Sequence, residues 1–193
     1  MSCNTSCKEI VMAFSQDIPP YIFQKDAAMG DMGVDLTSKG GFYAEPAVIY
    51  DNVFITLASN KISIKKPSDL NSLFVASFQG AEKRYPVWLT KVVDENSFFG
   101  VSDQLKQVKL LKLGRFDVVL CDRYIFQYFA KQLELFGHNE AITIDEHPFS
   151  TVNPDDYRPV FRDKKIRDDF NFGLSKLKES GGFEEIYTNY MNP

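Results

Sequence analysis

Several residue types and patterns are scarce in this chain of 193 residues, and each scarcity excludes a class of protein. Three cysteines are too few for a disulfide framework, and two histidines, His138 and His147, both in loop-like contexts, argue against a metal site. No apolar run approaches the ~20 residues that a membrane-spanning helix needs. The N-terminus has no charged region followed by an apolar one, so no signal peptide is recognised.

An excess of basic charge is also missing. The formal net charge is −4, which argues against nucleic acid or an anionic membrane as a partner, because either would call for a basic surface. Apolar residues make up 44% and charged residues 25%, as in an ordinary globular protein. This length allows one domain or two small lobes with a real core.

The cysteines occupy two different environments. Cys3 and Cys7 stand four apart in a polar N-terminal segment, where a disulfide in an oxidising compartment stays open as an alternative. Cys121 lies inside an apolar run, so we expect a buried thiol with a raised pKa and little reactivity.

What the sequence does contain is a central α/β block over residues 73–122. LFVASFQG (73–80) predicts a buried strand that stops at a glycine, and AEKRYPVWLTKVV predicts a helix directly after it. QLKQVKLLKLG predicts an amphipathic helix that ends at Gly114, and DVVLCD predicts a second strand. Strand, helix, helix and strand indicate a parallel unit, in which ligands bind beyond the carboxyl ends of the strands.

Two sets of residues lie at those strand ends. Gln79, Gly80 and Ala81 form a strand-to-helix turn, whose free N–H groups suit a carboxylate or phosphate, although a tight turn alone also explains the glycine. Asp122 ends the second strand and can pair with an ammonium group, cap the following helix, or do both. Arg123 is expected to be exposed or to pair with a carboxylate.

Further elements flank the block. We expect strands over residues 8–15, 52–57 and 141–146, a short extended piece at 157–163, and a helix start at 67–68. Helical spacing of apolar residues predicts helices over 123–136, 164–180 and 183–191, with Asp163 as an N-cap.

The ordered set of these segments resembles the type II periplasmic substrate-binding proteins, the family 3 group that binds amino acids and other polar solutes. The matching segments are IVMAFSQDIPPYIF, IYDNVFITLASNKISIKKPSDLNSLFVASFQGAEK, DQLKQVKLLKLGRFDVVLCDRYIFQYF and YRPVFRDKKIRDDFNFGLSKLKESGGFEEIYTNYM. The resemblance implies an α/β fold of two lobes joined by two hinge strands. Lobe one would comprise residues 1–51 and 147–193, and lobe two residues 52–146 with a mostly parallel sheet.

The sequence departs from the family between MGVDL (32–36) and FYAEP (42–46), where only TSKGG stands in place of roughly fifty family residues. That segment usually supplies the arginine that pairs with a ligand carboxylate. Lobe one is therefore expected to be truncated and incomplete, and its uncovered apolar surface invites pairing into a homodimer.

The resemblance implies a ligand site between the lobes and no cofactor. Its residues would be the turn and strand-end residues named above, Gln79, Gly80, Ala81 and Asp122, together with Tyr21, Phe14, Ser15 and Tyr43, with Asp51 nearby. For Phe14 and its neighbours, packing in lobe one or at the hinge is the alternative.

The expected function is binding of a small polar solute, an amino acid or similar zwitterion or carboxylate, outside the cytoplasm. The partner would be a permease of an ABC-type uptake system or a sensor kinase. A degenerate interaction module without a small ligand is the alternative. A dehydratase-like enzyme on the same fold is less expected, because no nucleophile–base pair is recognisable.

Overall fold

The computed structural model describes residues 12–13, 22–23, 27–29, 37–135, 141–151 and 158–191. The strands are β1 (Met12–Ala13), β2 (Ile22–Phe23), β3 (Ala27–Met29), β4 (Phe42–Tyr43), β5 (Asn52–Leu57), β6 (Val75–Ser77), β7 (Phe98–Gly100), β8 (Val118–Asp122), β9 (Ile144–Pro148) and β10 (Pro159–Phe161). The helices are α1 (Ala81–Arg84), α2 (Pro86–Asp94), α3 (Gln104–Lys112), α4 (Arg123–Leu135), α5 (Lys164–Glu179) and α6 (Gly182–Met191). Short 3-10 helices are η1 (Thr37–Lys39), η2 (Ala58–Asn60) and η3 (Pro67–Leu70).

The largest body is a five-stranded sheet in the order β7-β6-β8-β5-β9, here called the five-stranded unit together with α1 to α4. β6 pairs in parallel with both β7 and β8, whereas β5 pairs antiparallel with β8 and β9. The sheet is therefore mixed, and the expected parallel unit of β6 and β8 is confirmed within it. The antiparallel β5 escaped prediction because strand direction depends on where the chain enters the sheet, which no local pattern encodes.

Both faces of this sheet are covered, which explains its uninterrupted apolar strands. Val119 and Cys121 of β8 face a core with Val108 and Leu111 of α3 and Phe126 of α4. The alternate residues Val118 and Leu120 face the opposite core, which contains buried side chains of η3, α1 and α2: Leu70, Ala81, Leu89 and Val92. Side chains alternate between the two faces of a strand, so the run of four apolar residues in β8 contributes to both cores.

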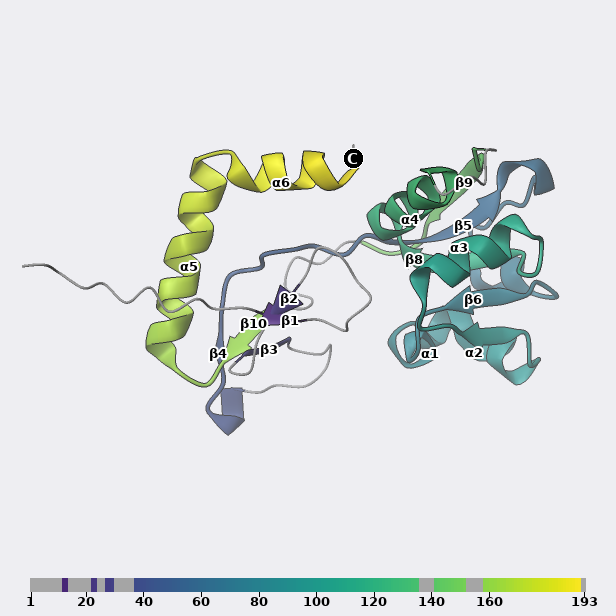
Figure 1. Cartoon of the computed structure of the whole chain (residues 1–193). Helices are drawn as coiled ribbons and strands as arrows, with labels where there is room; N and C mark the ends of the chain where they lie inside the picture. Colours follow the sequence, from purple (N-terminus) through teal and green to yellow (C-terminus); the bar gives the residue numbers. More distant parts are fainter. Residues whose placement is uncertain are drawn as a thin grey trace, which may run out of the picture.

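A second, smaller body is a three-stranded sheet in the order β3-β10-β4, called the three-stranded unit together with α5 and α6. Figure 1 shows the three-stranded sheet apart from the five-stranded unit, with α5 running along the outer side of that sheet, whereas α6 contacts α4. Ala44 and Phe161 form a buried cluster, against which Ile166 and Phe170 of α5 pack, and Val160 and Leu174 are also buried. β1 and β2 pair separately as a two-stranded sheet.

Most expected elements are present, with corrections of detail. Tyr85, at φ −121° and ψ 55°, separates α1 from α2 where one helix was expected, because Pro86 begins a new helix. β9 lies at Ile144–Pro148 rather than 141–146, so His147 is a strand residue that contacts the Thr56 hydroxyl at 3.0 Å. β7 was not anticipated. Asp163 caps α5 as predicted, accepting hydrogen bonds from the N–H groups of Lys165 and Ile166.

Cys121 is 2% exposed, as expected from its apolar strand, and burial raises the pKa of its thiol well above the ordinary value. Cys3, Cys7 and His138 lie outside the described residues. Among the helices that the structure describes, none is long and apolar enough to cross a membrane.

Candidate functional site

At one edge of the sheet of the five-stranded unit, β6, β8 and β9 end and β5 begins. The register pairs Ser77 at the end of β6 with Leu120 of β8, so Gln79 and Asp122 follow at that edge. β5 begins there, with Asn52 opposite Asp122, and β9 ends there, with Pro148 opposite Val53. The segments that connect the two units therefore leave from the edge that carries the predicted strand-end residues, here called the cleft edge.

The turn after β6 has the kind of backbone conformation that favours glycine. Gly80 has φ +85°, in the left-handed region, and no atom lies within 4 Å of a Cβ placed on it. Gln79 is exposed and Ala81 is fully buried against the α1–α2 core. α1 is a single turn, in which the N–H groups of Lys83 and Arg84 both bond to the Gly80 carbonyl oxygen. The turn thus presents exposed Gln79 and the start of a short helix at the cleft edge.

The Asp122 carboxylate is a hydrogen-bond acceptor for three backbone N–H groups. Oδ1 accepts from Tyr124 and Ile125 at 3.0 Å each, which is helix capping of α4. Oδ2 accepts from the N–H of Asp51 at 2.7 Å, which ties the connection before β5 to the end of β8. Burial raises the pKa of Asp122 above its ordinary value of 3.8, against the opposing effect of these three hydrogen bonds.

Arg123, the next residue, pairs with two carboxylates. Its Nε lies 2.7 Å from Asp51 Oδ2 and its Nη1 lies 3.0 Å from Glu146 Oε2. The other oxygen of Glu146 accepts a hydrogen bond from Gln127 Nε2 at 3.0 Å. The expectation that Arg123 pairs with a carboxylate is confirmed. Glu146 escaped the sequence analysis, because a lone acidic residue in a strand carries no signal of its partner.

An aromatic cluster lines the same end of the α1–α2 face. Tyr85 lies edge-on to Phe149 with ring centroids 5.0 Å apart, and Phe149 also contacts Phe54 and Trp88. The Tyr85 hydroxyl accepts a hydrogen bond from Asn52 Nδ2 at 3.1 Å. None of these rings was among the predicted site residues. The one available signal was Pro86, which breaks the helix and frees Tyr85 to turn inward.

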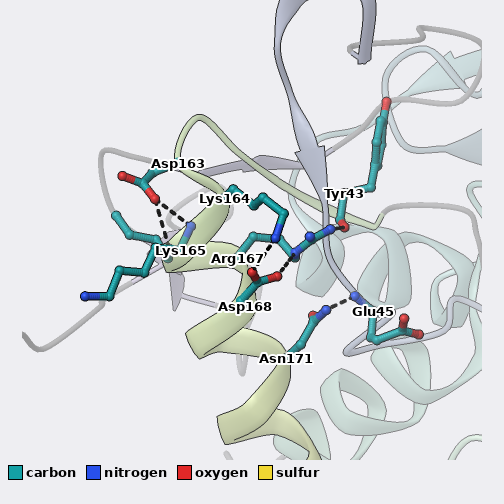
Figure 2. Close-up of polar contacts among 9 residues, drawn as sticks. Tyr43, Glu45, Asp163, Lys164, Lys165, Arg167, Asp168 and Asn171 are labelled. Carbon is teal, nitrogen blue, oxygen red and sulfur yellow. Dashed lines mark hydrogen bonds and ion pairs between the residues drawn. The ribbon is translucent and has the colours of Figure 1, made fainter.

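Tyr43 lies in the other unit. It is the last residue of β4, opposite Val160, and the Arg158 guanidinium lies 5.7 Å from the centre of its ring. Its carbonyl oxygen accepts a hydrogen bond from Arg167 at 2.8 Å, and in Figure 2 the ring extends away from α5. The other predicted residues of this lobe, Phe14, Ser15 and Tyr21, lie outside the described residues.

Within the described part of the chain, no three side chains of His, Cys, Asp or Glu are grouped so that they could hold a metal ion.

No protein-family model and no curated protein matches the sequence. Solved structures do match. An amino-acid ABC transporter substrate-binding protein from Streptococcus pneumoniae bound to L-arginine has 18% identity and a TM-score of 0.62, over 86% of this chain and 68% of that one. A histidine kinase sensor domain with similarity to periplasmic binding proteins has 16% identity and a TM-score of 0.60, over 86% and 70%.

A third match is an ancestral amino-acid-binding protein described as a precursor of cyclohexadienyl dehydratase. It has 16% identity and a TM-score of 0.58, over 86% of this chain and 69% of that one. A larger share of each solved chain than of this chain stays unmatched, which agrees with a shortened lobe one. The five-stranded and three-stranded units and these matches together show that the chain has the fold of the type II amino-acid-binding proteins, in a shortened form.

Proposed function

We propose that this protein binds a small polar solute, an amino acid or a similar zwitterion or carboxylate, at the cleft edge between its two units. The observation that carries the proposal is the parallel pairing of β6 and β8, which brings the Gln79–Gly80–Ala81 turn and Asp122 to one edge of the sheet. Ligands of open α/β sheets bind beyond such strand ends. Proteins of the same fold bind amino acids, including L-arginine.

In this proposal the turn accepts the negative end of the solute and Asp122 the positive end. Oδ1 of Asp122 already accepts two hydrogen bonds, whereas Oδ2 accepts one and keeps a lone pair for an ammonium group. Tyr21, Phe14, Ser15 and Tyr43 would approach from lobe one. Lobe one would comprise residues 1–51 and 147–193 and lobe two residues 52–146; β9 carries the second sheet two residues further, to Pro148.

The solute would be delivered outside the cytoplasm to an ABC-type permease or reported to a sensor kinase. The solved structure of an ABC transporter substrate-binding protein supports the first use, and that of a histidine kinase sensor domain supports the second. Lobe one, being shortened, would pair with a second copy of the chain. A dehydratase-like enzyme is favoured only by the ancestral precursor named above, and no acid–base pair in the described site supports it. The alternative is an interaction module without a small ligand. It is supported by the hydrogen bonds of Asp122, which already give this residue a structural role.

The first test is a thermal-shift screen of the whole chain against the twenty L-amino acids and a set of dicarboxylates. A solute at 100 times its Kd stabilises the folded state by about 2.7 kcal/mol. At least one solute is expected to raise the Tm. If none does, the proposal fails and the interaction module without a ligand is favoured.

The site itself is tested by calorimetry on Asp122→Asn with the solute found. Loss of a charge-assisted hydrogen bond should weaken binding by roughly 1.5–3 kcal/mol. Asp163→Asn is the matched control, because Asp163 also caps a helix but lies on α5. Equal affinities of the two folded variants would remove Asp122 from the site.

A further inference from the structure

A buried series of hydrogen bonds joins the ends of three neighbouring strands at the cleft edge. Ser77, the last residue of β6, pairs with Leu120 of β8 on one side and with Gly100, the last residue of β7, on the other. The Ser77 hydroxyl donates to the Leu120 carbonyl oxygen at 2.7 Å, and the Ser77 carbonyl oxygen accepts from the N–H of Val101 at 2.7 Å. Ser77 and Leu120 are fully buried. The bonds thus lie two residues before each half of the proposed site, Gln79 in the chain after Ser77 and Asp122 after Leu120.

The series continues to α3 through Gln107. Its Nε2 donates to the Val101 carbonyl oxygen at 2.7 Å. This group must be the NH₂ of the amide, because a carbonyl oxygen only accepts. Side chains of a helix lean towards its N-terminus, so Gln107 can reach the loop that leads into α3. Val101 is therefore held by β6 through its N–H and by α3 through its carbonyl oxygen.

The turn after β6 lies against this attached loop. Cα, Cγ and Cδ of Gln79 lie 3.7, 3.6 and 3.9 Å from the position that a Cβ would take on Gly100. The exposed Gln79 side chain therefore lies over the end of β7, beside the residue that precedes Val101. A displacement of the loop would remove this support from the turn.

The amide of Gln107 is unfavourable for stability alone. Gln107 is 0% exposed and stands beside Val108 and near Leu111, which belong to the apolar core. Its Oε1 is buried and has no hydrogen-bond partner among the described residues. A desolvated oxygen without a donor destabilises the folded state, a penalty that an apolar side chain of the same length would avoid. What the amide adds is the directed hydrogen bond to Val101.

We infer that Gln107 is a positioning residue of the proposed solute site: it holds the loop after β7 against the end of β6 and so fixes the Gln79–Gly80–Ala81 turn relative to Asp122. Gln107 acts without touching the solute, because its side chain is fully buried. Supporting groups of this kind keep a binding site in the geometry that its ligand requires. The effect on solute affinity rests on the proposed function, whereas the attachment of the loop does not.

The attachment is tested without any solute by native-state hydrogen exchange on Gln107→Met, in which a flexible apolar side chain replaces the amide. Two amides report on it. The N–H of Val101 is bonded to Ser77, and the N–H of Ala81 is bonded to the Phe78 carbonyl oxygen at 3.3 Å. Both should exchange about 10-fold faster than in the parent, through local opening of the loop and the turn.

Two controls separate this local effect from a general loss of stability. The N–H of Val75, bonded to the Ser97 carbonyl oxygen at 2.8 Å at the opposite end of the strands, should keep the parent's rate. Gln104→Met changes the other buried glutamine of α3 and leaves the bond to Val101 in place, so it should leave the Val101 amide unchanged.

Parent rates at Val101 and Ala81 in a folded Gln107→Met protein would overturn the inference. Equal acceleration of the Val75 amide would also overturn it, because the variant would then be destabilised as a whole. If Gln107→Met does not fold, Gln107→Ala decides by the same three amides, since it removes the same hydrogen bond with a smaller side chain.

Calorimetry with L-arginine gives a separate readout. If the parent binds it, Gln107→Met should raise the apparent Kd about 3–10-fold, because fewer molecules hold the binding-competent geometry, and Gln104→Met should keep the parent's Kd. An unchanged Kd in Gln107→Met, with faster exchange at Val101, would reduce Gln107 to a structural residue and overturn the positioning role. Absence of binding by the parent, with the same faster exchange, would refute the proposed function for L-arginine and leave the attachment of the loop standing.

Discussion

At the scale of single residues, Asp122 combines a structural role with a proposed binding role. Its carboxylate caps α4 and holds the backbone of Asp51, so both of its oxygens carry hydrogen bonds from the protein itself. A substitution there changes the fold's stability as well as any ligand contact. The two effects must therefore be measured separately.

We expect Asp122→Asn to destabilise the protein by about 1–3 kcal/mol, because one oxygen becomes an NH₂ group and a buried donor loses its acceptor. The pKa of Asp122 is raised in the folded state, so the folded protein binds the proton more tightly than the unfolded chain. The contribution of Asp122 to stability is thus fully present below its ordinary pKa of 3.8 and is lost as pH rises through the folded value. Urea unfolding across pH 3–7 should show this slope in the parent and a flatter one in Asp122→Asn.

Cys121 gives a second prediction at this scale. Its thiol is 2% exposed with a strongly raised pKa, so thiolate is scarce and the reagent has little access. In a Cys3→Ser, Cys7→Ser chain, an aromatic disulfide reagent should label Cys121 slowly in native conditions and fast in denaturant. Rapid labelling of the native protein would contradict the burial of β8.

At the scale of elements, replacing a glycine by alanine should have opposite effects on stability at a turn and in a helix. Gly80 ends the β6 segment with positive φ, where a side chain meets no neighbour yet strains the backbone. Gly173 lies inside α5, also with no atom near a Cβ built on it, in ordinary helical backbone. The two positions therefore separate backbone strain from helix propensity.

Gly80→Ala should lower the free energy of unfolding by about 1–2 kcal/mol, the cost of left-handed backbone for an L-residue. Gly173→Ala should raise it by about 0.5–1 kcal/mol, because alanine loses less entropy in a helix. Urea unfolding of both variants beside the parent measures the difference. A neutral or stabilising Gly80→Ala would disprove the positive φ at the turn.

At the scale of the whole molecule, the described residues of the two units form cores of unequal size. The five-stranded unit has two clusters of nine buried residues each, on opposite faces of its sheet. The buried cluster of the three-stranded unit, among the described residues, comprises Ala44 and Phe161. Burial of apolar area is the dominant stabilising contribution, so the three-stranded unit should open more readily.

Native-state hydrogen exchange should test this inequality. Amides of β5 and β8 should exchange only by global unfolding, whereas amides of β4 and β10 should exchange faster, through local opening of the three-stranded unit. A solute that binds between the units should slow the exchange of the second set more than that of the first. Equal protection of both sets in the solute-free protein would show that the units unfold as one.

The sequence by itself determined the strands β6 and β8 and the helix α3 of the central block, the helix cap at Asp163, the buried Cys121 and the strand ends where Asp122 and Gly80 lie. These features follow from short-range periodicity, capping chemistry and glycine placement, which act over a few residues. The ordered segments also led to the correct fold.

Only the tertiary structure decided which distant residues meet. Asp51, Arg123 and Glu146 are up to 95 positions apart, and the sequence around any one of them does not indicate that it contacts the others. The antiparallel entry of β5 brings Asp51 beside Asp122, and its pairing with β9 brings Glu146 within reach of Arg123. Sheet order and strand direction thus create the polar cluster at the cleft edge, because side-chain chemistry selects partners only after the backbone has brought them within a few ångströms.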